Sequence, residues 1–464
     1  MELPAEFIAQ MTALLGEKEL PQFLQSIEGA SPVSIRYNPL KPFLDQHFSA
    51  TTPIPWAAEA YYLAQRPSFT ADPSLHAGQY YVQEAASMFL SAVLDQALDL
   101  RVDVQALDLC AAPGGKSTLI ASKISPDSLL VSNEVIRSRA HILSENIQKW
   151  GCNNVWVSNN DPSDFGQKLP SFFDLIVVDA PCSGEGMFRK APHSIAEWSL
   201  SSVQHCALRQ QRILHDVWDS LKAGGILIYS TCTYNETENE DNLLKFRGDC
   251  PFESVALNFP KEWSITETTK DGLYAYRFYP HKTAGEGFFI SVLKKEGHSQ
   301  SKMPKVKKSV FNKVDPNTNT LLHDWLKDAD LFRFWLREAN INAIRPVHKA
   351  LAELLSDRLR LLYGGFELAV QTRKSVNPTQ AAALSPALNH ANFNCIDLDL
   401  EQALAYLRLD TLDAEIATNT KDWQLMRYNG LGLGWIKRID ARINNYYPKE
   451  WKIRLSLDKL LGTE

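Results

Sequence analysis

The sequence has few cysteines, and their arrangement excludes several kinds of protein. Seven cysteines are scattered over 464 residues, and no two of them form a CxxC pair. An odd, widely spaced set argues against a disulfide framework and against a structural zinc site. The eleven histidines show no HxH or HExxH grouping, so a metal enzyme is the least favoured class. We expect free thiols, no metal centre and a reducing cytoplasmic location.

Long apolar runs and an excess of positive charge are also lacking. No stretch approaches the roughly 18 apolar residues of a membrane span, and the N-terminus shows no secretory signal. The chain carries 48 Lys and Arg against 54 Asp and Glu, a net charge of −6. We therefore expect no membrane partner and no surface that is positively charged all over. The composition does not exclude a local basic face.

Short apolar runs alternate with amphipathic helical patterns through the middle of the chain. This alternation predicts an α/β domain with a doubly wound parallel sheet. Two later strand-like segments, 273–280 and 286–295, are expected to pair as an antiparallel edge. The five apolar runs cover residues 104–110, 129–134, 154–160, 173–181 and 224–232.

Changes in composition divide the chain into four predicted parts. An N-terminal extension is expected at 1–95, a catalytic domain at 96–297, a linker and intermediate region at 298–390, and a small separate domain at 391–464. The intermediate region opens with a polar, basic segment and contains no recognisable motif. The last part is marked by seven Lys or Arg against two acids between residues 424 and 455.

The first chemical motif is DLCAAPGGKST at 108–118, where a strand is expected to meet a helix. Glycines there allow close backbone approach, and the helix start offers free N–H donors. The motif matches neither a Walker A loop nor GxGxxG. Glu134, at the end of the next predicted strand, could bind ribose hydroxyls. Together they favour S-adenosylmethionine over a nucleotide, the alternative being a glycine-rich turn with an incidental acid.

The second and third motifs are DAPCSGEGMFRK at 179–190 and YSTCTYNETENE at 229–240. They end neighbouring predicted strands, so Asp179, Cys182 and Cys232 are expected at the ligand-binding edge of the sheet. Either cysteine could be a small buried apolar residue. Flanking hydroxyls and acids favour reactive thiols instead.

A thiol beside a methyl donor suits methylation of pyrimidine carbon 5. That carbon is too weak a nucleophile until a thiolate adds at carbon 6 and converts the ring to an enamine. Loss of the carbon-5 proton then expels the thiolate. An acid near N3, for which Asp179 is placed, would favour the addition.

These motifs resemble the nucleolar-protein/Sun family of RNA cytosine-C5 methyltransferases. The similarity rests on CAAPGGK, DAPCSGEG and STCTY and covers about residues 76–295. Residues 429–455 resemble the PUA-like RNA-binding domain of the bacterial RsmF branch. The resemblance implies a Rossmann-like core that depends on S-adenosylmethionine, an N-terminal RNA-binding extension and a C-terminal PUA-like domain.

The same resemblance implies roles for individual residues. Cys232 would be the nucleophile, and Cys182 would assist release of the methylated base. Asp179 would lie beside the methionine and the target cytosine, Glu134 would bind the ribose and Asp161 would lie near the adenine. The methionine part would be cradled by Cys110, Ala111, Ala112, Pro113, Gly114, Gly115 and Lys116.

RNA contacts are predicted where cationic and aromatic residues are interleaved. Cationic side chains bind phosphates, and aromatic side chains stack on unstacked bases. The alternative is a β-rich domain with its lysines in water. The linker residues Lys302, Lys305, Lys307 and Lys308 could follow an RNA backbone, although we favour a solvated linker. The C-terminal candidates are Arg427, Lys437, Arg438, Arg442, Lys449, Lys452 and Arg454, and the resemblance adds Lys190 and Arg36.

The leading hypothesis is therefore cytosine-C5 methylation of 16S rRNA in the 30S subunit or an assembly intermediate, by a monomer. Methylation of tRNA is the nearest alternative. A DNA-type enzyme would place its nucleophile at Cys182 and would not need Cys232. A non-catalytic assembly factor is a further alternative, although both cysteines and the whole glycine loop are present.

Overall fold

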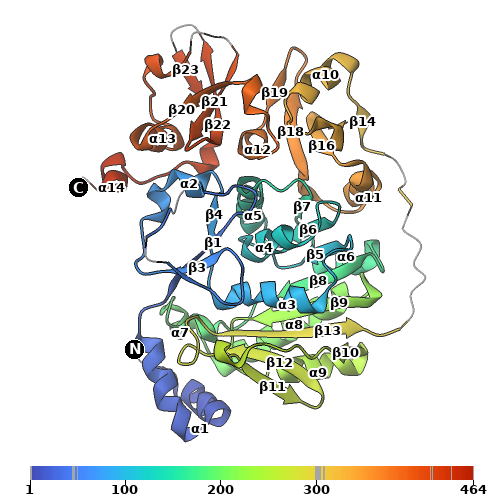
Figure 1. Cartoon of the computed structure of the whole chain (residues 1–464). Helices are drawn as coiled ribbons and strands as arrows, with labels where there is room; N and C mark the ends of the chain where they lie inside the picture. The colour runs from blue at the N-terminus through green and yellow to red at the C-terminus, as the bar shows by residue number, and fades with distance from the viewer. Residues whose placement is uncertain are drawn as a thin grey trace.

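The computed structural model describes residues 3–43, 47–49, 51–297, 305–306, 309–418, 420, 422–439 and 442–462. The linker lysines Lys302, Lys307 and Lys308 lie outside these residues. The catalytic domain occupies the middle of the molecule (Figure 1). The intermediate region and C-terminal domain lie on one side of it, and the N-terminal helix lies on the other. No helix of the described residues is both long and apolar enough to cross a membrane.

Five parallel strands form the centre of the catalytic sheet, in the order β9-β8-β5-β6-β7. Their side chains alternate between the two faces, and both faces are buried, as expected for a parallel sheet covered by helices. The predicted doubly wound sheet is confirmed. The strands are β5 (Gln105–Asp108), β6 (Leu129–Asn133), β7 (Val155–Ser158), β8 (Phe173–Asp179) and β9 (Leu221–Thr231).

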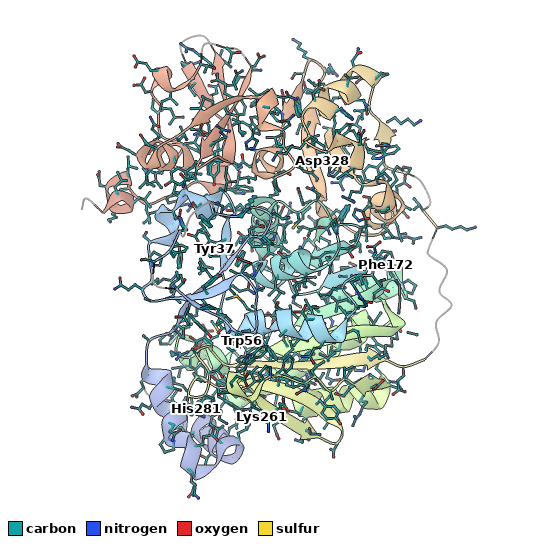
Figure 2. The ribbon with its side chains drawn as sticks, viewed as in Figure 1. Tyr37, Trp56, Phe172, Lys261, His281 and Asp328 are labelled. Carbon is teal, nitrogen blue, oxygen red and sulfur yellow. The ribbon has the colours of Figure 1, made fainter. Side chains whose placement is uncertain are left out.

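Helices cover both faces of this sheet. One apolar layer contains Trp56 and residues of α3, α4 and α5, and the other contains Phe172 and residues of α6, α8 and α9 (Figure 2). The short α7 (Ser194–Glu197) packs instead in the apolar cluster of Phe7 and Phe23. The helices that cover the sheet are α3 (Leu90–Ala97), α4 (Gly115–Lys123), α5 (Arg137–Trp150), α6 (Pro162–Lys168), α8 (Leu200–Trp218) and α9 (Glu240–Asp249).

An antiparallel group extends the sheet beyond β9. β12 (Leu273–Phe278) and β13 (Phe288–Lys295) pair antiparallel, which confirms the predicted pairing, and β13 also pairs with β9. The pair is not itself the edge, because β11 (Thr266–Lys270) lies outside β12. β10 (Phe252–Ser254) pairs with the other end of β13.

The N-terminal part packs directly on the catalytic domain. α1 (Ala5–Glu28) is interrupted at Gly16, whose φ of 75° leaves the helical region. Its Phe7 and Phe23 pack against Phe188 and Tyr234 of the catalytic domain. A small sheet follows in the order β2-β3-β1-β4. Its strands are β1 (Val33–Tyr37), β2 (Thr51–Pro53), β3 (Ala60–Leu63) and β4 (Tyr80–Val82), with α2 (Pro73–His76) before β4.

The intermediate region is largely folded rather than a simple linker. It forms a sheet in the order β14-β15-β16-β18-β19, while β17 joins the catalytic sheet beside β7. The strands are β14 (Asn312–Lys313), β15 (Arg333–Arg337), β16 (Asn340–Ile344), β17 (Leu361–Gly364), β18 (Phe366–Gln371) and β19 (Val376–Pro378). The helices are α10 (Pro316–Asp324), α11 (Lys349–Arg358) and α12 (Gln380–Leu384).

The C-terminal domain is rich in β-structure, and its Trp435, which is 1% exposed, packs against the intermediate region. Its sheet has the order β20-β21-β22-β23, with β20 parallel to β21 and the other pairs antiparallel. The elements are β20 (Asn394–Asp397), α13 (Leu400–Leu407), β21 (Trp423–Tyr428), β22 (Leu431–Ile439), β23 (Arg442–Asn445) and α14 (Leu457–Leu461).

Candidate active site

A cavity of about 280 Å³ opens at the carboxyl ends of β5, β8 and β9. Parallel α/β sheets bind ligands at this edge. The cavity brings together residues from the glycine loop, Asp179, Lys190 and Cys232, as the motifs predicted. Sequence reasoning assigned no site role to the rest of the lining, although it lies within the residues that carry the family resemblance: Tyr81, Val82, Gln83, Glu84, Ser87, Glu286, Gly287 and Phe288.

Side chains of α5 hydrogen-bond to the glycine loop. Arg139 Nη2 donates to the carbonyl oxygen of Ala112, and Asn146 Nδ2 donates to that of Pro113, each at 2.8 Å. Gly114 has a φ of 118°, and a Cβ there would lie 3.3 Å from Leu143 Cδ1. Only glycine adopts this conformation readily at such a close approach. The loop thus leads into α4 with its first N–H groups beside the cavity.

Lys116 and Asp179 form an ion pair in the cavity wall. Lys116 Nζ lies 2.8 Å from Asp179 Oδ2, and Ser230 Oγ donates to Asp179 Oδ1 at 2.7 Å. Burial is the largest single effect on the pKa of Lys116 and lowers it, but the charge and hydrogen bond of Asp179, together with the other acidic groups nearby, raise it by more in total, so the net shift is upward. Lys116 therefore stays cationic at neutral pH.

The two cysteines of the strand-end motifs meet beside this pair. Asp179 of β8 lies opposite Ser230 of β9, so the segments that follow leave the sheet together. Cys182 Sγ and Cys232 Sγ are 3.3 Å apart. The neighbouring Cys232 sulfur and burial raise the pKa of Cys182 well above its usual range. Cys182 thus keeps its proton, while Cys232 lines the cavity.

Two buried glutamates link the segment that contains Cys182 to the segment that contains Cys232. Glu238 accepts hydrogen bonds from the Ser183 N–H at 3.0 Å and from Asn235 Nδ2 and Gln210 Nε2, each at 2.8 Å. Glu185 accepts from the N–H groups of Tyr234 and Asn235 at 2.8 and 3.0 Å. Sequence reasoning missed both acids, although each stands three to six residues from a motif cysteine.

Asp108, the last residue of β5, is a further buried acid. Its side chain is fully buried, and Ser117 Oγ donates to Oδ2 at 2.6 Å. Among the described residues Oδ1 has no hydrogen-bond partner. Burial raises the pKa of Asp108 to about 7.

Glu134 and Asp161 stand at the ends of β6 and β7, outside the cavity lining. Glu134 Oε1 accepts from the Ile136 N–H at 2.9 Å. Asp161 caps α6 by accepting from the Ser163 N–H at 3.1 Å, and its Oδ2 lies 2.6 Å from Arg212 Nη2. Val135 and Ile136, 55% and 50% exposed, give this edge an apolar surface.

Arg36 does not occupy the position expected of an RNA contact, and this prediction is corrected. The residue is 4% exposed. Its guanidinium donates to Thr118 Oγ1 at 2.6 Å and to Gln83 Oε1 at 3.0 Å, and lies 4.5 Å from the centre of the Trp150 ring. Arg36 therefore joins the N-terminal sheet to α4. Lys190, in contrast, is exposed at the cavity.

The C-terminal cations differ in their surroundings. Lys452 and Arg454 are exposed. Arg427 Nη2 lies 2.5 Å from Asp397 Oδ2, Lys437 Nζ lies 5.3 Å from the Trp423 ring centre, and Arg438 Nη1 donates to the Ala417 carbonyl at 3.3 Å. Arg442 and Lys449 line a second cavity.

Three family models match the chain in the order expected. The N-terminal domain of the 16S rRNA methyltransferase RsmF matches residues 3–85, the 16S rRNA methyltransferase RsmB/F model matches 95–294, and the methyltransferase RsmF PUA domain matches 393–453. The predicted α/β methyltransferase core and the PUA-like domain are thereby confirmed.

Curated relatives match over nearly the full length. Ribosomal RNA small subunit methyltransferase F of Pectobacterium carotovorum subsp. carotovorum is 31% identical, with 97% of this chain and 95% of the relative covered. The protein of the same description from Aliivibrio fischeri is 31% identical, with 97% of each covered. Among solved structures, a methyltransferase homologue from Pyrococcus horikoshii shares 27% identity at a TM-score of 0.53, over 62% of this chain and 94% of that one.

The fold and the cavity at the strand ends thus define a Rossmann-like methyltransferase. Within that class, the chain belongs to the RsmF family of 16S rRNA methyltransferases.

Proposed function

We propose that this protein methylates carbon 5 of a cytosine in 16S rRNA, with S-adenosylmethionine as methyl donor and Cys232 as covalent nucleophile. It would act as a cytoplasmic monomer on the 30S subunit or an assembly intermediate. The observation that carries the proposal is the pair of thiols 3.3 Å apart, one of them lining a cavity shared with the glycine loop and Asp179.

The residues around the cavity suit S-adenosylmethionine. Cys110 to Lys116 would hold the methionine part, because the loop presents backbone and small side chains to the cavity. Glu134 would bind the ribose and Asp161 would lie near the adenine, with Val135 and Ile136 as its apolar support. When bound, the cofactor would supply an electrophilic methyl group, whose bond to the sulfonium sulfur breaks and leaves S-adenosylhomocysteine.

The chain's own residues would carry the rest of the reaction. The Cys232 thiolate forms a bond to carbon 6, the electrons of the carbon 5–carbon 6 double bond move onto the ring toward N3, and the Lys116 cation, held by Asp179, balances the negative charge that develops there. Carbon 5 then gains the methyl group and loses its proton to a base. The electrons of that C–H bond restore the ring double bond and break the carbon–sulfur bond. The Cys182 S–H stabilises the departing thiolate by hydrogen bonding.

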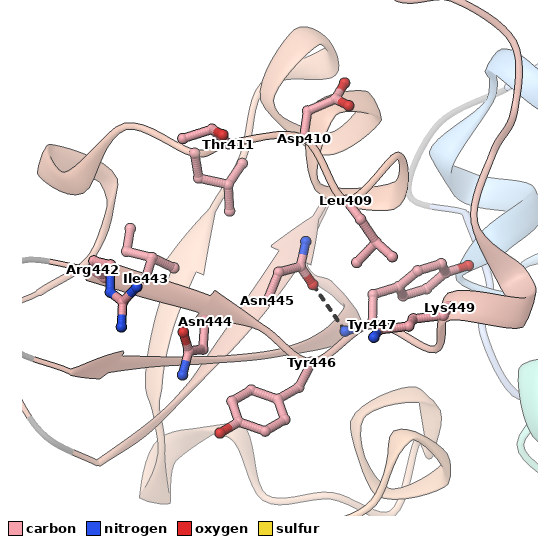
Figure 3. A pocket seen from close by; sticks show the side chains of 11 residues that line it. Leu409, Asp410, Thr411, Arg442, Ile443, Asn444, Asn445, Tyr446, Tyr447 and Lys449 are labelled. Carbon is pink, nitrogen blue, oxygen red and sulfur yellow. Dashed lines mark hydrogen bonds between the residues drawn. The ribbon is translucent and has the colours of Figure 1, made fainter.

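RNA binding is proposed for the second cavity, in the C-terminal domain (Figure 3). This cavity has a volume of about 830 Å³ and is bounded by β23 and the segment 409–412. Arg442 and Lys449, both exposed, form no ion pair with the described residues, whereas Asp410 is paired with Arg408 at 2.6 Å. The cavity wall therefore has uncompensated positive charge, which attracts phosphate.

The remaining RNA contacts are proposed around these two cavities. Lys190 would meet the RNA beside the target base, which must leave its stack to reach Cys232. The C-terminal contacts would be Arg427, Lys437, Arg438, Lys452 and Arg454, beside Arg442 and Lys449.

The test measures label transferred from S-adenosylmethionine to undermethylated 30S subunits, free 16S rRNA and bulk tRNA. We expect 5-methylcytosine in 30S subunits or 16S rRNA, and none with Cys232→Ala. Label confined to tRNA would support the proposed reaction but contradict rRNA as its substrate. RNA binding without any label would instead identify a non-catalytic assembly factor.

A further inference from the structure

The intermediate region contributes strand β17 to the catalytic sheet, beside β7, the strand that Asp161 follows. β17 runs antiparallel to β7, with Leu361 opposite Ser158 and Gly364 opposite Trp156. Because the two strands run in opposite directions, β17 begins where β7 ends. Arg360, the residue before β17, therefore lies at the edge of the sheet that carries Glu134 and Asp161.

Backbone and amide groups join Arg360 to the end of β7. The N–H of Asn159 and the Nδ2 of Asn160 donate to the Arg360 carbonyl oxygen at 3.0 and 3.2 Å. In return, the Arg360 N–H donates to Asn160 Oδ1 at 3.1 Å. These bonds use the backbone of Arg360, so its side chain is not needed for them.

The connection continues from β7 to β6 and β5 through Asn133. The Asn160 N–H donates to Asn133 Oδ1, and Asn133 Nδ2 donates to the Asn160 carbonyl oxygen, each at 3.0 Å. Asn133 Nδ2 also donates to the Leu109 carbonyl oxygen at 3.2 Å. Leu109 directly precedes the glycine loop. We call Asn133, Asn159, Asn160 and the Arg360 backbone the amide chain.

The groups proposed to hold the nucleoside end of the cofactor are joined to the amide chain. Asn159 Nδ2 donates to the carbonyl oxygens of Glu134 and Val135 at 2.7 and 2.9 Å, and Asp161 follows Asn160 directly. Asn133 and Asn160 are 1% and 7% exposed. Buried amides that lose a partner cost free energy, so the geometry of this edge depends on all its members.

We propose that the amide chain positions the nucleoside end of the cofactor and that Asn160 is its central positioning residue. The intermediate region is then a structural part of the cofactor site and not a spacer between domains. Asn160 acts through Glu134, Val135 and Asp161 and does not touch the cofactor itself. This inference rests on the proposed function, because it takes S-adenosylmethionine as the ligand.

Three variants of the full chain separate positioning from general stability. Asn160→Ala removes the central amide. Arg360→Pro removes the N–H group that donates a hydrogen bond to Asn160 Oδ1. Proline is tolerated at this position because Leu359, with φ of −118° and ψ of 154°, already has the conformation favoured before proline. Asn154→Ala is the matched control. Asn154 is 6% exposed at the opposite end of β7, and its Nδ2 donates to the carbonyl oxygens of Ser125 and Ser128 at 3.2 and 3.1 Å.

The experiment measures the Kd of S-adenosylhomocysteine by calorimetry, the Tm, and kcat at saturating cofactor. We expect Asn160→Ala and Arg360→Pro to weaken binding by about tenfold, as for the loss of about one hydrogen bond. Their kcat at saturation should stay within about twofold of the parent chain. Asn154→Ala should lower the Tm to a similar degree without changing the Kd.

The inference is overturned if Asn160→Ala binds the probe as tightly as the parent chain, or if Asn154→Ala weakens binding equally. These results differ from failure of the proposed function. A parent chain that neither binds S-adenosylhomocysteine nor transfers methyl groups overturns both. A parent chain that binds and methylates, beside an Asn160→Ala variant of unchanged Kd, overturns only the role of the amide chain.

Discussion

Asp108 shows how one buried side chain can link the glycine loop to the pH dependence of stability. Burial raises its pKa to about 7 from the ordinary value of 3.8. In the folded protein the carboxyl is therefore protonated below pH 7, whereas in the unfolded chain it ionises near pH 4. Between these values unfolding releases a proton, so the contribution of Asp108 to stability falls as pH rises.

Replacing Asp108 with Asn removes this titration and keeps an oxygen that can accept from Ser117. We expect the free energy of unfolding of the parent chain, relative to Asp108→Asn, to fall between pH 4.5 and 7.5, on the order of 4 kcal/mol at most. Urea unfolding at several pH values measures the difference. Asp95→Asn, at a half-exposed site paired with Lys123, is the control. Parallel pH profiles for the parent chain and Asp108→Asn would contradict the assignment.

At the scale of elements, the register between β8 and β9 and the buried glutamates together place the two thiols. Glu238 accepts hydrogen bonds from Ser183 of one segment and Asn235 of the other. Without that carboxylate, the Ser183 N–H loses its acceptor, whereas Asn235 Nδ2 keeps its bonds within its own segment and to Glu185. With one of the two bridging carboxylates gone, the segments can shift relative to each other, and small displacements of reacting groups lower the reaction rate.

Glu238→Ala should therefore lower kcat by about 100-fold while the Kd for S-adenosylhomocysteine stays within about twofold. Glu238→Gln, which retains one acceptor oxygen, should recover part of the rate. Glu236→Ala is the control from the same segment, because Glu236 is about half exposed and pairs with Lys270. Equal loss of cofactor binding and of kcat in Glu238→Ala would indicate general disruption instead of misplaced thiols.

At the scale of the whole molecule, the C-terminal cavity is expected to contribute affinity and not chemistry. The double variant Arg442→Ala/Lys449→Ala should weaken binding of 16S rRNA by about tenfold and reduce the slope of log affinity against log salt by about two. Filter binding at several salt concentrations measures both. The pair Arg373→Ala/Lys374→Ala, exposed between β18 and β19, is the control. An unchanged salt slope in the first variant would exclude these phosphate contacts.

The parts of this account that sequence could predict are those with a local signal. Apolar runs ending in small or acidic residues located β5 to β9, and the motifs located both cysteines at one sheet edge. Arg36 could not be assigned correctly, because only tertiary packing shows that its guanidinium lies over Trp150. β17 and Asn160 were missed for a related reason, since their pairing spans 200 residues of sequence. Hydrogen bonds between residues far apart in the chain produce no periodic pattern in the sequence, so sequence alone does not predict them.

The central claim, that Cys232 attacks the base and Cys182 frees it, is tested most directly by covalent adducts. Parent and variant chains are incubated with S-adenosylmethionine and undermethylated 16S rRNA, then separated under denaturing conditions without reducing agent. We expect a stable protein–RNA adduct to accumulate with Cys182→Ala. Cys232→Ala and the double variant should form none. An adduct that persists in Cys232→Ala, or its absence from Cys182→Ala while methyl transfer continues at the parent rate, would contradict the account.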